Sequence, residues 1–240
     1  TSFKYALLAI MSVLIYYLID RKYRIGYLAL ISCGFIVTIN YFLLIYVIAY
    51  SFINFFIGSK LYISKHKKAL FRAGIIINLV QILVLNYASF AVDPIFKYFN
   101  SQIEISKLSE IIIPIGVSYF TLQGIGYLIN IKMGWEKPER NFIHFLLYIA
   151  FYPKYLSGPI ERSNHFLPQL KSLSSFNRQN VTEGLQLILL GFIKKDVIAN
   201  QLSLIVSPVY KDIDAFGGST LLLVILVQPL YLYFDFAGYT

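Results

Sequence analysis

The sequence is poor in charge, cysteine and histidine, and each shortage excludes something. Only 14% of its 240 residues are charged and 58% are hydrophobic, whereas an ordinary soluble domain carries about 25% charged residues. A single cysteine, Cys33, excludes an intrachain disulfide. The three histidines are far apart and have no cysteine partner, so no metal site is expected. The composition is that of a membrane protein.

Long runs without a charged residue predict an all-α polytopic membrane protein. A helix needs roughly 20 apolar residues to cross a bilayer. At least five spans are expected from the runs 5–19, 25–59, 73–92, 111–131 and 215–234. The run 25–59 lies between two basic segments and should cross twice, as a hairpin that turns near Asn40. One long tilted helix is the alternative.

The positive charge lies between the apolar runs. The net charge of +9 could suggest nucleic acid, but the excess is concentrated in short loops such as 20–24 and 60–72, so no nucleic-acid partner is expected. Short basic loops stay on the cytoplasmic side. The first span then places the N-terminus outside, and segment 93–110 is expected to be an extracytoplasmic loop with an interfacial turn.

The predicted span 111–131 is interrupted by Pro114 and by three glycines, and it carries Ser118, Thr121 and Gln123. Small residues and hydroxyls at intramembrane depth often serve close helix packing. The alternative is the wall of a polar cavity or tunnel, because backbone that is not helical needs protein or water as its partner.

The stretch YIAFYPKYLSGPIER (148–162) starts like a membrane helix and then fills with charge, proline and glycine. The uncharged piece 141–153 is too short for a comfortable span, so a re-entrant or interfacial segment is predicted. The helix would break beside a polar cavity, with Lys154, Glu161 and Arg162 facing water or each other. Alternatively, 154–183 is a plain cytoplasmic loop with solvated charges.

The apolar helix predicted over 184–206 carries Lys194, Lys195 and Asp196 in its middle. Either it lies along the membrane interface with its lysines reaching out to water, or it lines an aqueous cleft. A further ionisable residue, Asp235, ends the last apolar run and is a functional candidate by its position at a membrane boundary.

Four motifs occur together in order: IPIGVSYFTLQGIGYLINI, RNFIHFLLYIAFYPKYLSGPIERSNHFLPQL, GLQLILLGFIKKDVIAN and YLYFDFAGYT. In this order and spacing they resemble the membrane-bound O-acyltransferases, most closely the bacterial branch that modifies alginate and teichoic acids. The resemblance implies a multi-helix bundle with short and re-entrant helices, of which this chain is the N-terminal portion. It also implies one transmembrane acyltransferase domain over 1–240.

The same resemblance implies the activity and its partners. An acyl group, acetyl in the simplest case, would pass from acetyl-CoA or an acyl carrier protein through a tunnel to a hydroxyl of an exported polysaccharide. No bound cofactor is implied; the acyl donor is a co-substrate. Expected partners are the lipid bilayer, the polysaccharide, the donor or its carrier protein, and an extracytoplasmic protein. The location would be a bacterial inner or plasma membrane.

The family's catalytic histidine lies beyond the FDFAGY motif, so it is expected after Thr240, and this segment alone is expected to be inactive. His66 is predicted to be solvated, His144 to be a hydrogen-bonded packing residue, and His165 not to be the base. The candidates for the tunnel or substrate path are Gln123, Ser157, Gly158, Pro159, Glu161, Arg162, Asp235, Gly238 and Tyr239.

Three other functions remain open from the sequence. D-alanine could replace acetyl as the transferred group. A transporter could use the interrupted span 111–131 as a substrate path, although no internal repeat supports it. The chain could also be a membrane scaffold without catalytic function.

Overall fold

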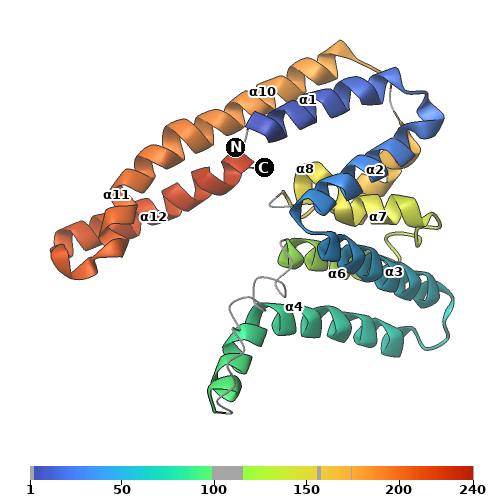
Figure 1. Cartoon of the computed structure of the whole chain (residues 1–240), viewed down its shortest axis with the longest axis horizontal. Helices are drawn as coiled ribbons and strands as arrows, with labels where there is room; N and C mark the ends of the chain where they lie inside the picture. Colours follow the sequence, from blue (N-terminus) through green and yellow to red (C-terminus); the bar gives the residue numbers. More distant parts are fainter. Residues whose placement is uncertain (1–2, 99–115, 156–157, 174, 240) are drawn as a thin grey trace. The chain divides into compact units, whose positions relative to one another are not determined.

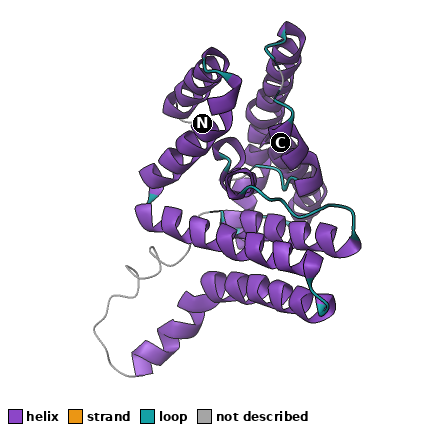
Figure 2. Ribbon diagram, turned by 90° about the vertical axis from the view of Figure 1, so that its right-hand side faces the viewer, coloured by secondary structure: helices purple, strands orange, loops and turns teal. Residues whose placement is uncertain are grey.

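The protein is helical throughout the part of the chain that the structure describes. The computed structural model describes residues 3–98, 116–155, 158–173 and 175–239. Within these ranges it contains helices and loops and no strand (Figure 2). The chain divides into two compact units, Thr1–Ser174 and Ser175–Thr240, and each is described by itself.

The first unit brings together helices of very different lengths (Figure 1). In chain order they are α1 (Phe3–Leu18), α2 (Arg21–Ile39), α3 (Tyr41–Ile63), α4 (Lys67–Tyr98), α6 (Val117–Met133), α7 (Phe142–Ala150), α8 (Tyr152–Tyr155) and α9 (Ser163–Lys171). The second unit contains α10 (Arg178–Phe192), a π-helix (Ile193–Ala199), α11 (Asn200–Lys211), a short 3₁₀ turn (Ile213–Ala215) and α12 (Gly218–Tyr239).

Four of the described helices are long and apolar enough to cross a membrane, namely Arg21–Ile39, Tyr41–Ile63, Lys67–Leu85 and Gly218–Gly238. The sequence predicted at least five spans. Two of the predicted runs form shorter helices, because α1 has 16 residues and α6 has 17. The prediction of an all-α polytopic membrane protein is confirmed.

The run 25–59 is divided between two helices, as predicted, and the break falls at Asn40. Asn40 has an extended backbone, with φ −165° and ψ 131°, and its side chain accepts a hydrogen bond from the backbone N–H of Phe42 at 2.8 Å. A side-chain oxygen at this position satisfies one of the donors at a helix start. The chain changes direction there (Figure 1), so the alternative of one long helix is wrong.

Helix α4 continues further than the charge pattern predicted. It runs from Lys67 to Tyr98, and so includes the first six residues of the expected loop 93–110. A helix of 32 residues is about 48 Å long, which exceeds the hydrocarbon core of about 30 Å. The helix therefore continues past Asp93, the first charged residue after its apolar run. The remainder of the expected loop, 99–110, lies outside the described residues.

The core of the first unit forms where α2, α3, α6, α7 and α9 pack together. Tyr127 of α6 and Phe145 of α7 are fully buried, with ring centroids 4.6 Å apart. All six residues from Phe145 to Ala150 are buried, as expected of a helix that is apolar on every side. The short apolar piece is therefore a helix of nine residues whose last six residues are enclosed by protein. Its re-entrant placement stays a prediction.

The second unit is a packed helical hairpin with a small core of Val206, Val209 and Val224. The π-helix packs against α12. A Cβ added to Gly191 or Gly238 would lie 2.9 Å from the backbone oxygen of the other glycine, so α10 and α12 can approach this closely only because both residues lack a side chain.

Candidate functional site

The loop after α7 holds a buried lysine. Lys154 lies in α8, outside the four candidate spans, and its side chain is 7% exposed. Its Nζ lies 3.3 Å from Oε2 of Glu161 and 3.8 Å from the centre of the Phe166 ring. The lysine is thus covered by a carboxylate and by aromatic faces, which attract a cation. A plain loop with solvated charges is therefore wrong for Lys154, and the prediction that Lys154 and Glu161 face each other is confirmed.

Burial changes the protonation of this lysine. It lowers the pKa of Lys154 from its usual value to about 8, and the negative charge of Glu161, with its hydrogen bond, opposes that shift. Desolvation disfavours the charged form of a lysine, whereas a nearby carboxylate favours it. Because little of the side chain is accessible and its ammonium group faces Glu161, Lys154 does not present a free ammonium group to a reactant.

The Gly-Pro segment closes back onto the same lysine. The Gly158 N–H donates to the Lys154 carbonyl at 3.0 Å, and a Cβ at Gly158 would overlap the Lys154 backbone. Pro159 and Arg162 are exposed, and α9 begins directly after Arg162. Ser157 lies outside the described residues. Glycine is required at 158 because the turn leaves no space for a side chain.

One hydroxyl joins two of the predicted residues. Tyr148 of α7 is fully buried, and its hydroxyl oxygen lies 3.1 Å from the backbone oxygen of Gln123 and 3.0 Å from that of Glu161. The side chain of Gln123 is itself buried, at 4% exposure. The structure therefore brings Gln123 and the loop 158–162 together through Tyr148, which the sequence analysis did not identify as a site residue.

A second polar network lies under α9 and was also missed. Ser163 donates to Glu136 at 2.5 Å and accepts from Asn130 at 3.0 Å. Burial raises the pKa of Glu136, and the hydrogen bonds from Ser163 and Asn130 partly offset this rise. Glu136 could have been recognised from the sequence, because it lies between a membrane helix and a proline in a loop that is too short for full solvation.

Glu139 lies in the same loop and stays ionised more readily than usual. Burial alone would raise its pKa, but the Lys171 ammonium at 2.6 Å and the backbone N–H groups of Asn141 and Arg140 lower it. Several donors to one carboxylate favour its charged form. The loop 134–141 is thereby attached to the end of α9.

Buried polar side chains join α3, α4 and α6. The Tyr50 hydroxyl donates to Asn78 at 2.6 Å, and the Asn78 amide donates to Asn54 at 2.8 Å. Thr121 accepts from Gln81 at 3.0 Å. Buried polar side chains that satisfy one another hold membrane helices together. Thr121 therefore serves helix packing, the alternative that the sequence left open, whereas a substrate-path role for Gln123 stays a prediction.

The remaining predicted residues belong to the second unit. Lys195 of the π-helix donates to the carboxylate of Asp235 on α12, and both side chains are partly buried. Gly238 lies one turn further along α12, where a Cβ would come within 2.9 Å of the Lys195 backbone nitrogen. Tyr239 is the last residue of α12, and its side chain lies outside the described residues. Asp235 and Gly238 are thus brought together with Lys195, which explains why this cation can lie in an apolar helix.

No histidine is held in the geometry of a base. His66 and His165 are exposed, so the prediction of a solvated His66 is confirmed. His144 is 16% exposed, and its Nδ1 lies 3.8 Å from Oε1 of Glu139, beyond hydrogen-bond distance. It is a packing residue as predicted, and among the described residues its Nδ1 has no hydrogen-bond partner.

Comparisons with known proteins give three informative relatives, although no family model matches the chain. The chain is 28% identical over 231 residues to the probable alginate O-acetylase AlgI of Pseudomonas syringae pv. tomato, covering 94% of this chain and 44% of that protein. It is 25% identical over 215 residues to the peptidoglycan O-acetyltransferase of Helicobacter pylori, covering 78% and 40%. It is 31% identical over 132 residues to the teichoic acid D-alanyltransferase of Streptococcus thermophilus, covering 52% and 32%. The chain spans less than half the length of each of these three relatives.

Proposed function

Because the chain is related to the bacterial membrane-bound O-acyltransferases, we propose that the protein transfers an acyl group to a hydroxyl of a cell-envelope or exported polysaccharide. The observation that carries this proposal is the match to an alginate O-acetylase along 94% of the chain. The apolar helices support it as well, since they place the loop 150–163 and its Lys154–Glu161 pair within a membrane protein.

Acetyl is the transferred group that the relatives favour. Two of the three relatives described above are named for O-acetylation of a polysaccharide. The alternative is D-alanine, which is favoured by the relative of 31% identity named for D-alanyl transfer to teichoic acid. The two groups differ chemically in that D-alanine brings an additional ammonium charge to the polymer.

The topology that goes with this activity has the N-terminus outside and the basic loops 20–24 and 60–72 in the cytoplasm of a bacterial cell. The donor would be acetyl-CoA or an acyl carrier protein on the cytoplasmic side. The acceptor polysaccharide, together with an extracytoplasmic partner protein, would lie on the opposite side of the cell membrane. A general base or an oxyanion-stabilising group is needed for attack by a hydroxyl.

Deletion of the gene tests the proposal. Polysaccharide from the deletion strain should release less acetate on mild alkaline hydrolysis than polysaccharide from the parent strain, and the intact gene should restore it. A loss of released D-alanine instead of acetate would support the alternative donor. Unchanged release of both groups, with the acceptor polymer present, would contradict acyl transfer as the function.

A further inference from the structure

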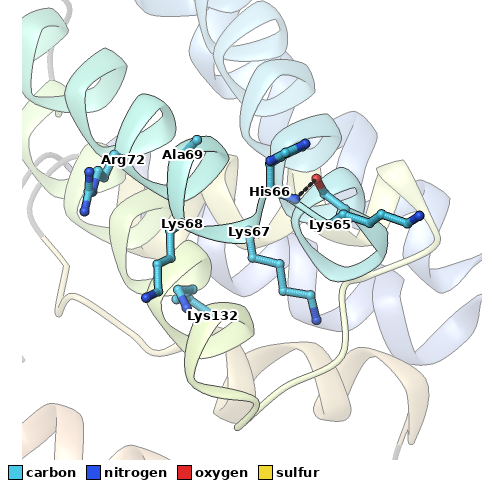
Figure 3. A pocket seen from close by; sticks show the side chains of 8 residues that line it. Lys65, His66, Lys67, Lys68, Ala69, Arg72 and Lys132 are labelled. Atoms are coloured by element: carbon cyan, nitrogen blue, oxygen red, sulfur yellow. Dashed lines mark hydrogen bonds between the residues drawn. The ribbon is translucent and has the colours of Figure 1, made fainter.

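A strongly basic cavity lies where three membrane helices end. It has a volume of about 730 Å³ and is formed by the loop between α3 and α4, the first turns of α4, and the end of α6 (Figure 3). Four cationic side chains come from the loop and α4, and a fifth comes from α6, 60 residues later than Arg72 in the sequence. These are Lys65, Lys67, Lys68, Arg72 and Lys132.

The charge of this cavity is not neutralised. No carboxylate lines it, and among the described residues none of the five cations forms an ion pair with an acidic side chain. Like charges gathered in one cavity repel one another, and the repulsion is stronger near a low-dielectric membrane protein than in free water. The fold therefore holds together a group of charges that favours an anion.

The N-terminus of α4 adds further positive charge to the basic cavity. Its first turn contains Lys67 and Lys68 and no acidic residue. The N-terminus of a helix carries partial positive charge, so acidic residues normally stabilise it and basic residues do not. The backbone N–H groups of such a turn bind phosphate well when an anion is present. An anion at this position would offset both the helix charge and the side-chain charges.

We propose that this basic cavity binds a phosphate-bearing ligand with at least two negative charges. Its volume lies within the usual range for cofactor-sized sites, about 300–1,000 Å³, and Lys68 and Lys132 face it from different helices. Lysine binds phosphate as a compact point charge. The cavity also lies at the membrane ends of α3, α4 and α6, where clusters of basic residues bind anionic headgroups.

Two sources share this chemistry. One is a soluble compound with two or more phosphate charges, and the other is the headgroup of an anionic phospholipid. Inorganic pyrophosphate serves as the soluble probe, with the protein in nanodiscs of phosphatidylcholine only. Cardiolipin serves as the lipid probe, added to the same nanodiscs. Binding is measured without any acyl transfer, so the result is independent of the proposed activity.

The test variant is Lys68→Gln with Lys132→Gln, which removes two charges from two helices while their carbon stems remain. Its matched control is Arg21→Gln with Lys22→Gln, which removes two exposed charges from the first turn of α2. We expect affinity for at least one probe to fall by roughly tenfold or more in the test variant, and by less than about threefold in the control. The single variant Arg72→Gln, which removes one charge instead of two, should show a smaller loss in the same direction.

Each outcome decides the question. If the test variant loses affinity for pyrophosphate, the ligand is a soluble compound. If it loses affinity for cardiolipin alone, the ligand is a lipid headgroup. Either result supports a phosphate site in the basic cavity. Equal affinities of the unchanged protein and the test variant for both probes would overturn the proposal, as would the absence of any binding. If the double variant fails to fold, the Arg72→Gln comparison and the weakening of binding by added salt decide between these outcomes.

Discussion

Gly124 of α6 gives Tyr50 of α3 the space in which its hydroxyl can reach Asn78 of α4. A Cβ at Gly124 would overlap the Tyr50 hydroxyl oxygen, and that hydroxyl donates to Asn78 at 2.6 Å. A missing side chain on one helix thus permits a hydrogen bond between two others. The same helix has a second glycine, Gly126, at which an added Cβ would meet nothing within 4 Å.

Gly124→Ala should destabilise the protein, whereas Gly126→Ala should not. Alanine in a helix interior is normally more stable than glycine by about 0.5–1 kcal/mol, so Gly126→Ala should be neutral or stabilising. At Gly124 the forced shift of Tyr50 should cost about 1–3 kcal/mol. Thermal unfolding in detergent, followed by circular dichroism, measures both. The cost of Gly124→Ala should shrink in a Tyr50→Phe background, and an unchanged cost there would contradict the overlap with the hydroxyl.

The pKa of Lys154 predicts a pH dependence of stability. Lysine in the unfolded chain keeps its proton up to its usual pKa near 10.4, whereas buried Lys154 releases it near pH 8. Between these values the unfolded state binds more protons, so the free energy of unfolding should rise with pH from about 8 to about 10.4, by up to roughly 3 kcal/mol. The rise should be absent in Lys154→Met. Thermal unfolding at a series of pH values tests this, and identical pH profiles would contradict the buried position of the charge.

Substitutions of Gly158 and Pro159 should affect activity and folding to different extents. Pro159 is exposed, so Pro159→Ala relaxes the loop without opening the core, and we expect a loss of transfer of about tenfold with little loss of folded protein. Gly158→Ala should reduce both, because its Cβ would overlap the Lys154 backbone. Transfer assays on membranes with matched protein levels make the comparison. Equal losses of transfer and expression in Pro159→Ala would indicate a folding role.

Asp235→Asn should destabilise the second unit. It removes the carboxylate charge that faces Lys195, and charged hydrogen bonds of this kind contribute about 1.5–3 kcal/mol. Replacing both residues by apolar ones, as Lys195→Met with Asp235→Leu, should recover much of that loss, because apolar pairs often substitute for buried ion pairs. Urea or thermal unfolding measures Asp235→Asn, the double variant, and the single variants Lys195→Met and Asp235→Leu. A double variant as unstable as the sum of both single changes would mean that the two residues do not act as a pair.

His165→Ala should leave substantial transfer, because His165 is exposed and, within the described part of the chain, has no carboxylate partner of the kind that orients a catalytic base. An assay of polysaccharide acetylation in a deletion strain carrying this variant measures the effect. Complete inactivation of a well-folded His165→Ala protein would contradict the prediction that His165 is not the base.

Helix positions and the break at Asn40 followed from the sequence because charge and hydropathy report directly on membrane helices. Glu161 was among the partners expected for Lys154, but the partner of Lys195 was not predicted, because Lys195 reaches Asp235, a residue 40 positions away. Glu136 and Tyr148 were missed because their roles depend on which helix packs over them. A sequence shows that a charge is unusual in its surroundings, whereas its partner depends on tertiary packing.

The length of α6 affects the lipid around it. The helix has 17 residues and is flanked by Gly116 and Gly134, both in the left-handed conformation, with φ of 83° and 77°. It is therefore about 25 Å long, about 5 Å less than an average hydrocarbon core, and neither flanking glycine extends it. A bilayer that α6 crosses has to compress locally to avoid hydrophobic mismatch.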